Sequence, residues 1–67
     1  MNREQTSKLF RYEHLPDFLQ VASKPFHELA VNIIDSLPPS EERTLAIRSL
    51  WEAKNLTVYA VVDSNKG

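Results

Sequence analysis

Apolar residues in the middle of the chain recur with the period of an α-helix. After Pro25 they stand at positions i, i+3, i+4, i+7 and i+11, as Phe26, Leu29, Ala30, Ile33 and Leu37. Side chains with this spacing lie on one helical face, so the pattern predicts an amphipathic helix over residues 25–37. Pro25 fits its first position, where a missing backbone N–H removes no hydrogen bond.

A proline pair separates this helix from a second, longer one. Ser40 follows the pair as an N-cap, and Glu41 and Glu42 place negative charge in the first turn, where the helix dipole favours it. Apolar residues then continue without a breaker, which predicts a helix over residues 40–62. Because the connection is so short, the two helices are expected to fold back on each other as an antiparallel αα-hairpin.

The N-terminal part is expected to add one short helix. Pro16 fits the first position of a helix over residues 16–23, which ends because Pro25 disfavours helical geometry at Lys24. Residues 1–14 show no clear period and are expected to form an arm. The predicted fold is therefore all-α: one domain over residues 1–67, with a short N-terminal helix followed by a long antiparallel αα-hairpin.

Two features predict self-association: the small size of the chain and the apolar residues at the end of the long helix. A chain of 67 residues without cysteine buries only roughly 60% of its surface and has no disulfide to compensate. Apolar side chains over residues 56–62 cover nearly every direction around the axis, whereas one hairpin partner buries one stripe. We expect a homo-oligomer; the alternatives are that the short N-terminal helix covers this surface or that the valine-rich end forms a strand.

Composition excludes several classes of function. The net charge is -1, without a basic block, which disfavours binding to polymeric nucleic acid. No apolar run approaches the roughly 18 residues of a membrane span, and the polar residues 1–8 do not resemble a signal peptide, so a cytoplasmic protein is expected. With only His14 and His27 as histidines, and no phosphate loop, nucleophile motif or metal-ligand set, the sequence predicts a protein that is not an enzyme and needs no cofactor.

Two segments contain candidate ligand-binding residues. If Pro25 begins a helix, Lys24 is its N-cap, and the N–H groups of Phe26 and His27 point outward beside the lysine ammonium as a phosphate site. The alternative is that the Ser23 hydroxyl or water satisfies these donors and that Lys24 is only solvated.

The second segment is Phe10-Arg11-Tyr12, where two aromatic residues flank a cation. An aromatic face stacked on a nucleotide base contributes about 1–3 kcal/mol, and arginine adds charge or a cation–π contact. The alternative is that both rings simply pack the arm against the hairpin. Trp51 and Tyr59 are assigned to the core or to an interface.

An ordered series of short motifs resembles a family of phage proteins. The run "YEHLPDFLQVASKPFHELAVNIIDSLPPSEERTLAIRSLWEAKNLTVYAVV" contains HLP-x-x-LQ, SKPF-x-x-LA, a proline turn, ERT-x-A-x-R-x-L and EAK. Over roughly residues 10–62 it resembles the anti-CBASS cyclic-oligonucleotide sponges and their relatives that act against Thoeris immunity. The resemblance implies a helical hairpin assembled as a homohexamer, a trimer of dimers. It also implies capture, without turnover, of cyclic dinucleotides such as 3',3'-cGAMP, and in many cases of cyclic trinucleotides.

The resemblance also implies residue roles. Cyclic dinucleotides lie between protomers, with Tyr12 stacking on the bases and Lys24 at the phosphates, and a two-fold ligand suits a two-fold interface. For a trinucleotide pocket the resemblance matches no particular residue, and Arg11, Arg43 and Thr44 are the candidates. The alternative function is a helical interaction module that docks a protein partner through the apolar residues 56–62.

Overall fold

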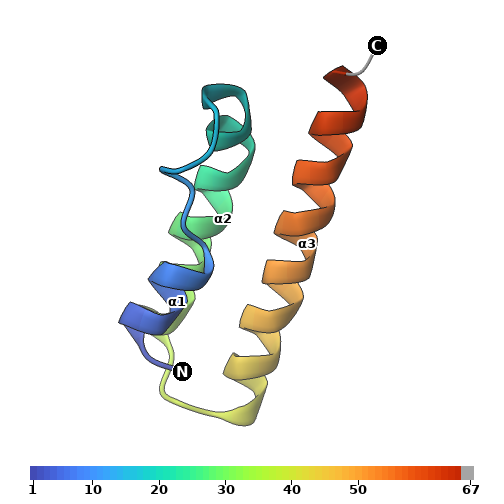
Figure 1. The fold of residues 1–67 in the computed structure, drawn as a ribbon. Helices are drawn as coiled ribbons and strands as arrows, with labels where there is room; N and C mark the ends of the chain where they lie inside the picture. Colours follow the sequence, from blue (N-terminus) through green and yellow to red (C-terminus); the bar gives the residue numbers. More distant parts are fainter. Residues whose placement is uncertain (66–67) are drawn as a thin grey trace.

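The protein is all-helical in the computed structural model, which describes residues 1–65. Its helices are α1 (Arg3–Leu9), α2 (Asp17–Ser36) and α3 (Glu41–Asn65). In Figure 1, α2 and α3 lie side by side and run in opposite directions, and α1 packs against α2 near its C-terminal end. The predicted all-α class is confirmed. No helix within residues 1–65 is long and apolar enough to cross a membrane.

Helix α2 is continuous, so the predicted break between residues 16–23 and 25–37 is wrong. Pro25 lies in the interior of the helix, and Pro16 is its N-cap rather than its first helical residue. An interior proline removes one backbone hydrogen bond and crowds the carbonyl four residues earlier. Packing outweighs this local cost, because α2 buries residues before and after the proline, from Leu19 to Ile34.

The predicted arm over residues 1–14 contains a helix of its own. Asn2 caps α1, since its side chain accepts a hydrogen bond from the Gln5 N–H at 2.8 Å. The Gln5 side chain in turn accepts from the Asn2 N–H at 3.0 Å, which completes a capping box. This local signal, an Asn followed three residues later by a Gln, is readable in the sequence although the segment has no apolar period.

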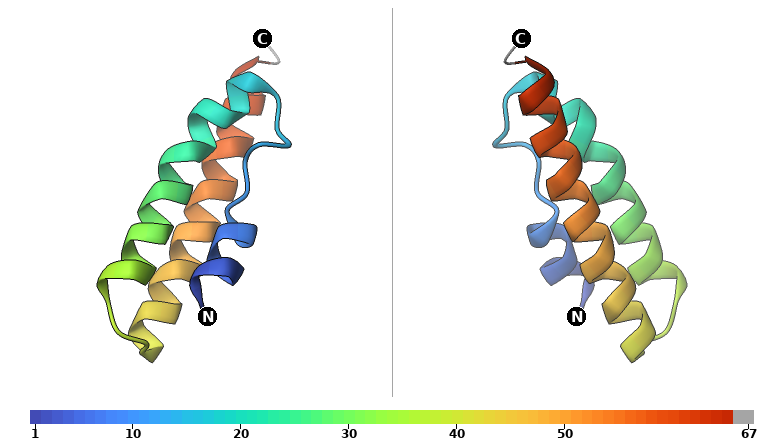
Figure 2. Two further views of the ribbon diagram at one scale, coloured as in Figure 1. Left: turned by 90° about the vertical axis from the view of Figure 1, so that its left-hand side faces the viewer. Right: turned by 90° about the vertical axis from the view of Figure 1, so that its right-hand side faces the viewer.

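The core is small and lies at one end of the α2–α3 pair. Phe10, at the end of α1, is 1% exposed and clusters with Ala30, Ile34 and Ile47. Figure 2 shows that α1 covers only the half of the pair next to the connection between α2 and α3. Within the described part of α3, no residue after Ile47 is fully buried.

The far half of α3 is open and partly apolar. Leu56 is 69% exposed and Tyr59 is 67% exposed. The alternative in which the short helix over residues 16–23 covers this end holds only in part. These residues form the first turns of α2, which lie beside the end of α3 (Figure 1), but they leave Leu56 and Tyr59 exposed. The strand alternative is wrong, since α3 continues to Asn65. Trp51 and Tyr59 are both exposed in the single chain, so the core assignment fails for them and the interface assignment stays a prediction.

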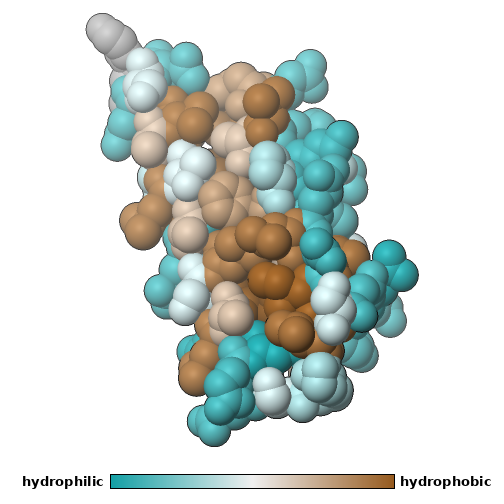
Figure 3. All heavy atoms as spheres, turned by 180° about the vertical axis from the view of Figure 1, so that it is seen from behind, coloured by the Kyte–Doolittle hydropathy of each residue, from teal (hydrophilic) through white to brown (hydrophobic). Residues whose placement is uncertain are grey.

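A further apolar surface lies on the face shown in Figure 3, seen from behind. Apart from that view, large side chains that remain about half-exposed include Phe18 and Leu29 on α2, Leu37 at its C-cap and Leu45 on α3. The contact between α2 and α3 in the half far from their connection also includes a polar side chain. Lys54 follows Ile47 at i+7 and is half-buried. Burial lowers the pKa of the Lys54 ammonium below its usual value, so the seam contains a partly desolvated cation.

Replacing Pro25 with alanine should stabilise the protein. Alanine restores the backbone N–H and removes the ring clash inside α2, and this gain exceeds the loss of rigidity in the unfolded chain, for a net effect of about 2 kcal/mol. Urea unfolding monitored by circular dichroism measures it. A destabilised P25A variant would show that the helix is in fact interrupted at this position.

Candidate functional site

One pocket lies where the segment after α1 crosses the first turns of α2. Its volume is about 490 Å³, and its lining consists of Tyr12, Glu13, Asp17, Gln20, Val21 and Lys24. We call it the Tyr12 pocket. It brings together Tyr12 and Lys24, which the sequence proposed separately, one on the arm and one on a helix.

The segment that carries Tyr12 is fixed at both ends. Before Tyr12, Phe10 is buried in the core. After it, the Gln20 side-chain amide donates hydrogen bonds to the carbonyls of Glu13 at 3.3 Å and Leu15 at 2.8 Å. The Leu15 N–H also donates to the Tyr12 carbonyl at 3.0 Å, which closes a turn. Tyr12 is thus presented by an ordered turn rather than by a loose arm.

The Tyr12 ring rests against α2. Its centroid lies 5.4 Å from that of His27, with the two planes at 67°, a T-shaped contact. The His27 Nε2 lies 3.1 Å from the Ser7 Oγ of α1. His27 therefore joins α1, the Tyr12 segment and α2. The packing alternative is correct for Phe10, which is buried, whereas Tyr12 is half-buried and keeps part of its ring at the pocket.

Lys24 is not an N-cap, and this overturns the phosphate site predicted at a helix N-terminus. Because α2 is continuous, the N–H groups of Phe26 and His27 lie within the helix and bond to carbonyls four residues earlier. Phe26 is half-buried and packs against the core, away from the pocket lining. Lys24 itself is exposed, and its ammonium lies 3.9 Å from the carboxylate of Glu28. Such an exposed i,i+4 pair contributes only about 0.3–0.5 kcal/mol, so a ligand can compete for the ammonium.

The Tyr12 pocket of one chain contains more negative than positive charge. Glu13 and Asp17 face a single ammonium from Lys24. The backbone N–H groups of Glu13 and Tyr12 bond the Glu13 carboxylate and lower its pKa below the usual value, with the Tyr12 N–H donating at 3.3 Å. Glu13 is therefore ionised at neutral pH. A phosphate in this pocket gains from Lys24 and is repelled by the two carboxylates.

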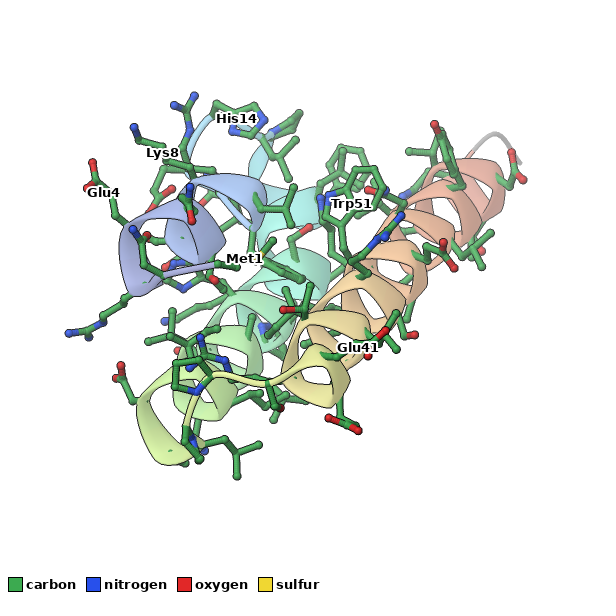
Figure 4. All side chains as sticks on the ribbon, turned by 90° about the horizontal axis from the view of Figure 1, so that it is seen from below. Met1, Glu4, Lys8, His14, Glu41 and Trp51 are labelled. Atoms are coloured by element: carbon green, nitrogen blue, oxygen red, sulfur yellow. The ribbon has the colours of Figure 1, made fainter. Side chains whose placement is uncertain are left out.

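Arg43 is buried and serves the fold. Its guanidinium donates to the carbonyls of Leu37 at 2.9 Å, Ile34 at 3.3 Å and Met1 at 2.8 Å. It thus caps the C-terminal end of α2 and ties down the start of the chain; Figure 4 shows Met1 between α1 and α3. These bonds occupy Arg43 at the end of the molecule opposite the Tyr12 pocket. The structure gives it a structural role in place of the predicted ligand contact.

The other two candidates also lie outside the pocket lining. The Thr44 hydroxyl donates to the Ser40 carbonyl at 3.3 Å in the first turn of α3. Arg11 is exposed, and its positive charge contributes to the lowered pKa of Glu13. Of the six predicted site residues, the structure therefore unites Tyr12 and Lys24 and leaves Arg11 beside them. It places Phe26, Arg43 and Thr44 elsewhere.

Four lining residues were missed by the sequence analysis. They are Glu13, Asp17, Gln20 and Val21. The last three lie with Lys24 at i, i+3, i+4 and i+7, which is one face of a helix. That signal was present in the sequence. It was overlooked because the predicted helix ended before Lys24.

The chain matches no protein-family model, no curated protein and no solved structure. Within residues 1–65 no three metal-ligating side chains gather. The interpretation of the Tyr12 pocket therefore depends on its own residues and on the motifs of the sequence.

Replacing Arg43 with methionine should destabilise the protein by at least about 2 kcal/mol, because charged hydrogen bonds to three carbonyls are lost. Thermal unfolding measures the effect. Arg48→Met, at an exposed position of the same helix, is the matched control and should change the stability by less than about 0.5 kcal/mol. Equal effects of the two substitutions would contradict the capping role.

Protonation of the Glu13 carboxylate should lower the stability of the folded protein at acid pH. Its pKa in the folded chain lies below the usual 4.5, so its carboxylate stabilises the fold above pH 4.5, and this contribution disappears as the pH falls through the lower folded value. In Glu13→Gln that part of the acid dependence should vanish. Unfolding at a series of pH values from neutral to acid tests this, and parallel curves for the two proteins would argue against it.

Proposed function

We propose that the protein binds and sequesters cyclic oligonucleotide second messengers, above all cyclic dinucleotides such as 3',3'-cGAMP, without turnover. The capture would block CBASS immune signalling in the cytoplasm of a bacterial host. One observation carries the proposal: Tyr12 and Lys24, from different elements, line one pocket. The ordered motifs over residues 10–62, which resemble those of phage sponges, support the same function.

The chemistry of the pocket suits one half of such a ligand. A base stacks on the ring of Tyr12, a contact of about 1–3 kcal/mol, and the neighbouring phosphate lies at the Lys24 ammonium. The volume of about 490 Å³ falls within the roughly 300–1,000 Å³ of small-molecule sites. One chain thus offers one stacking face and one cation, the Lys24 ammonium, whose exposed pair with Glu28 is weak. This is half of what two bases and two phosphates need.

We propose that a second copy completes the site and that the chains assemble as a homohexamer, a trimer of dimers. A two-fold axis presents each group twice, and this matches the near two-fold symmetry of a cyclic dinucleotide. Support comes from the small core and from the large apolar side chains left exposed on α2 and α3. Competition with a micromolar receptor requires about -8 kcal/mol of binding free energy, which two half-sites can supply together.

A second candidate is an interaction module that docks another protein through the end of α3. The exposure of Leu56 and Tyr59 supports it. The two functions predict different masses in solution. A sponge buries this surface in a closed oligomer, whereas the module is a monomer until its partner arrives.

Calorimetric titration with a panel of cyclic di- and trinucleotides tests the proposed function. Lys24→Met should weaken cyclic dinucleotide binding at least about tenfold, because it removes a charged phosphate contact. Lys8→Met is the matched control, since Lys8 is equally exposed and also pairs with a glutamate four residues away, Glu4. It should bind normally.

Tyr12→Ala should weaken binding by a similar factor, and Tyr12→Phe should keep most of the affinity because the stacking face remains. Both variants should keep the mass of the native assembly, measured by light scattering. Absence of heat with every ligand of the panel would remove the sponge function. If both Lys24→Met and Tyr12→Ala bind normally, the binding site is not the Tyr12 pocket.

A further inference from the structure

The charge of the Tyr12 pocket is difficult to reconcile with phosphate recognition alone. Each chain contributes one ammonium, from Lys24, and two carboxylates, from Glu13 and Asp17. A second copy doubles both, so assembly does not change their ratio. In a site for a ligand with two negative phosphates, the carboxylates therefore need a different partner on the ligand.

Only some parts of a cyclic oligonucleotide can satisfy a carboxylate, which accepts hydrogen bonds and donates none when ionised. Phosphate oxygens are acceptors and are repelled. Guanine presents two adjacent donors on its Watson–Crick edge, N1–H and the N2 amino group, which fit the two oxygens of one carboxylate. Adenine presents its amino group beside an acceptor nitrogen, so a carboxylate meets one donor and one repelling lone pair.

Asp17 is the carboxylate with both oxygens available. Glu13 already accepts a hydrogen bond from the Tyr12 N–H with its Oε2. For Asp17, no hydrogen bond or ion pair is found among the residues that the structure describes. It lies in the first turn of α2, while Lys24 follows at i+7 on the same face. Seven residues of helix span about 10 Å, which is close to the length of a nucleotide from base edge to phosphate.

We infer that Asp17 is a specificity residue that selects guanine-containing cyclic dinucleotides by accepting the N1–H and N2 amino hydrogens of the base. This inference rests on the proposed function. In this arrangement one nucleotide spans the pocket: its guanine edge lies at Asp17, its ring against Tyr12 and its phosphate at Lys24. Glu13 is held by the backbone beside Tyr12 and has one oxygen fewer to offer.

Titration of the native protein with cyclic di-GMP and with cyclic di-AMP gives the ratio that tests the inference. A bidentate contact discriminates between bases by at least about tenfold, so cyclic di-GMP should bind more tightly by that factor. In Asp17→Asn the amide offers one donor and one acceptor, which no longer fits the two adjacent donors of guanine, N1–H and the N2 amino group, and does fit the amino group and N1 of adenine. The ratio should fall about tenfold or more, with cyclic di-AMP bound more tightly than by the native protein.

Glu52→Gln is the matched control: it removes one negative charge from an exposed position on α3, outside the pocket lining. It should leave the ratio unchanged. If Asp17→Asn strengthens both ligands equally, Asp17 is only a repelling charge; the specificity role is then wrong, while the sponge function stands. If the native protein binds neither ligand nor any other cyclic nucleotide, the proposed function and this inference fail together.

Discussion

Burial of Phe10 between the helices is the interaction on which the rest of the molecule depends. Its ring is 1% exposed and clusters with side chains of both α2 and α3, so the end of α1 is fixed in the hydrophobic core. Tyr12 follows two residues later, and Gln20 fixes the far side of its turn. Without the anchor at Phe10 the pocket would have no stable wall opposite α2.

The same packing divides the molecule into two unequal halves. Near the α2–α3 connection, α1, Phe10 and Arg43 close the structure. Far from it, α3 lies against the first turns of α2, and its side chains Leu56 and Tyr59 remain exposed. A chain with so small a core is marginally stable alone. In the proposed assembly this open half is the surface that further copies would cover, and the proposed ligand site lies beside it.

The pocket also illustrates how charge can contribute to selectivity. A purely cationic site would attract any phosphate, whereas carboxylates beside a single lysine disfavour phosphate in general and demand donors from the bound molecule. Backbone N–H groups favour the ionised form of Glu13. The carboxylates of Glu13 and Asp17 would therefore both require hydrogen-bond donors on a bound molecule. The same arrangement agrees with the prediction, made from the net charge of -1, that the protein does not bind polymeric nucleic acid.

The sequence by itself determined the helical class and the start of α3, because these depend on local periodicity and capping. It also singled out Tyr12 and Lys24 by their side-chain chemistry, and both line the pocket. It misjudged Pro25, where a local rule predicted a break and packing on both sides kept α2 whole. It also could not distinguish a ligand-binding role of Arg43 from a capping role, since only the fold brings the carbonyls of Ile34, Leu37 and Met1 to its guanidinium. Tertiary structure alone decided that Tyr12, Asp17 and Lys24 share one pocket, because it packs the turn that carries Tyr12 against the continuous helix α2.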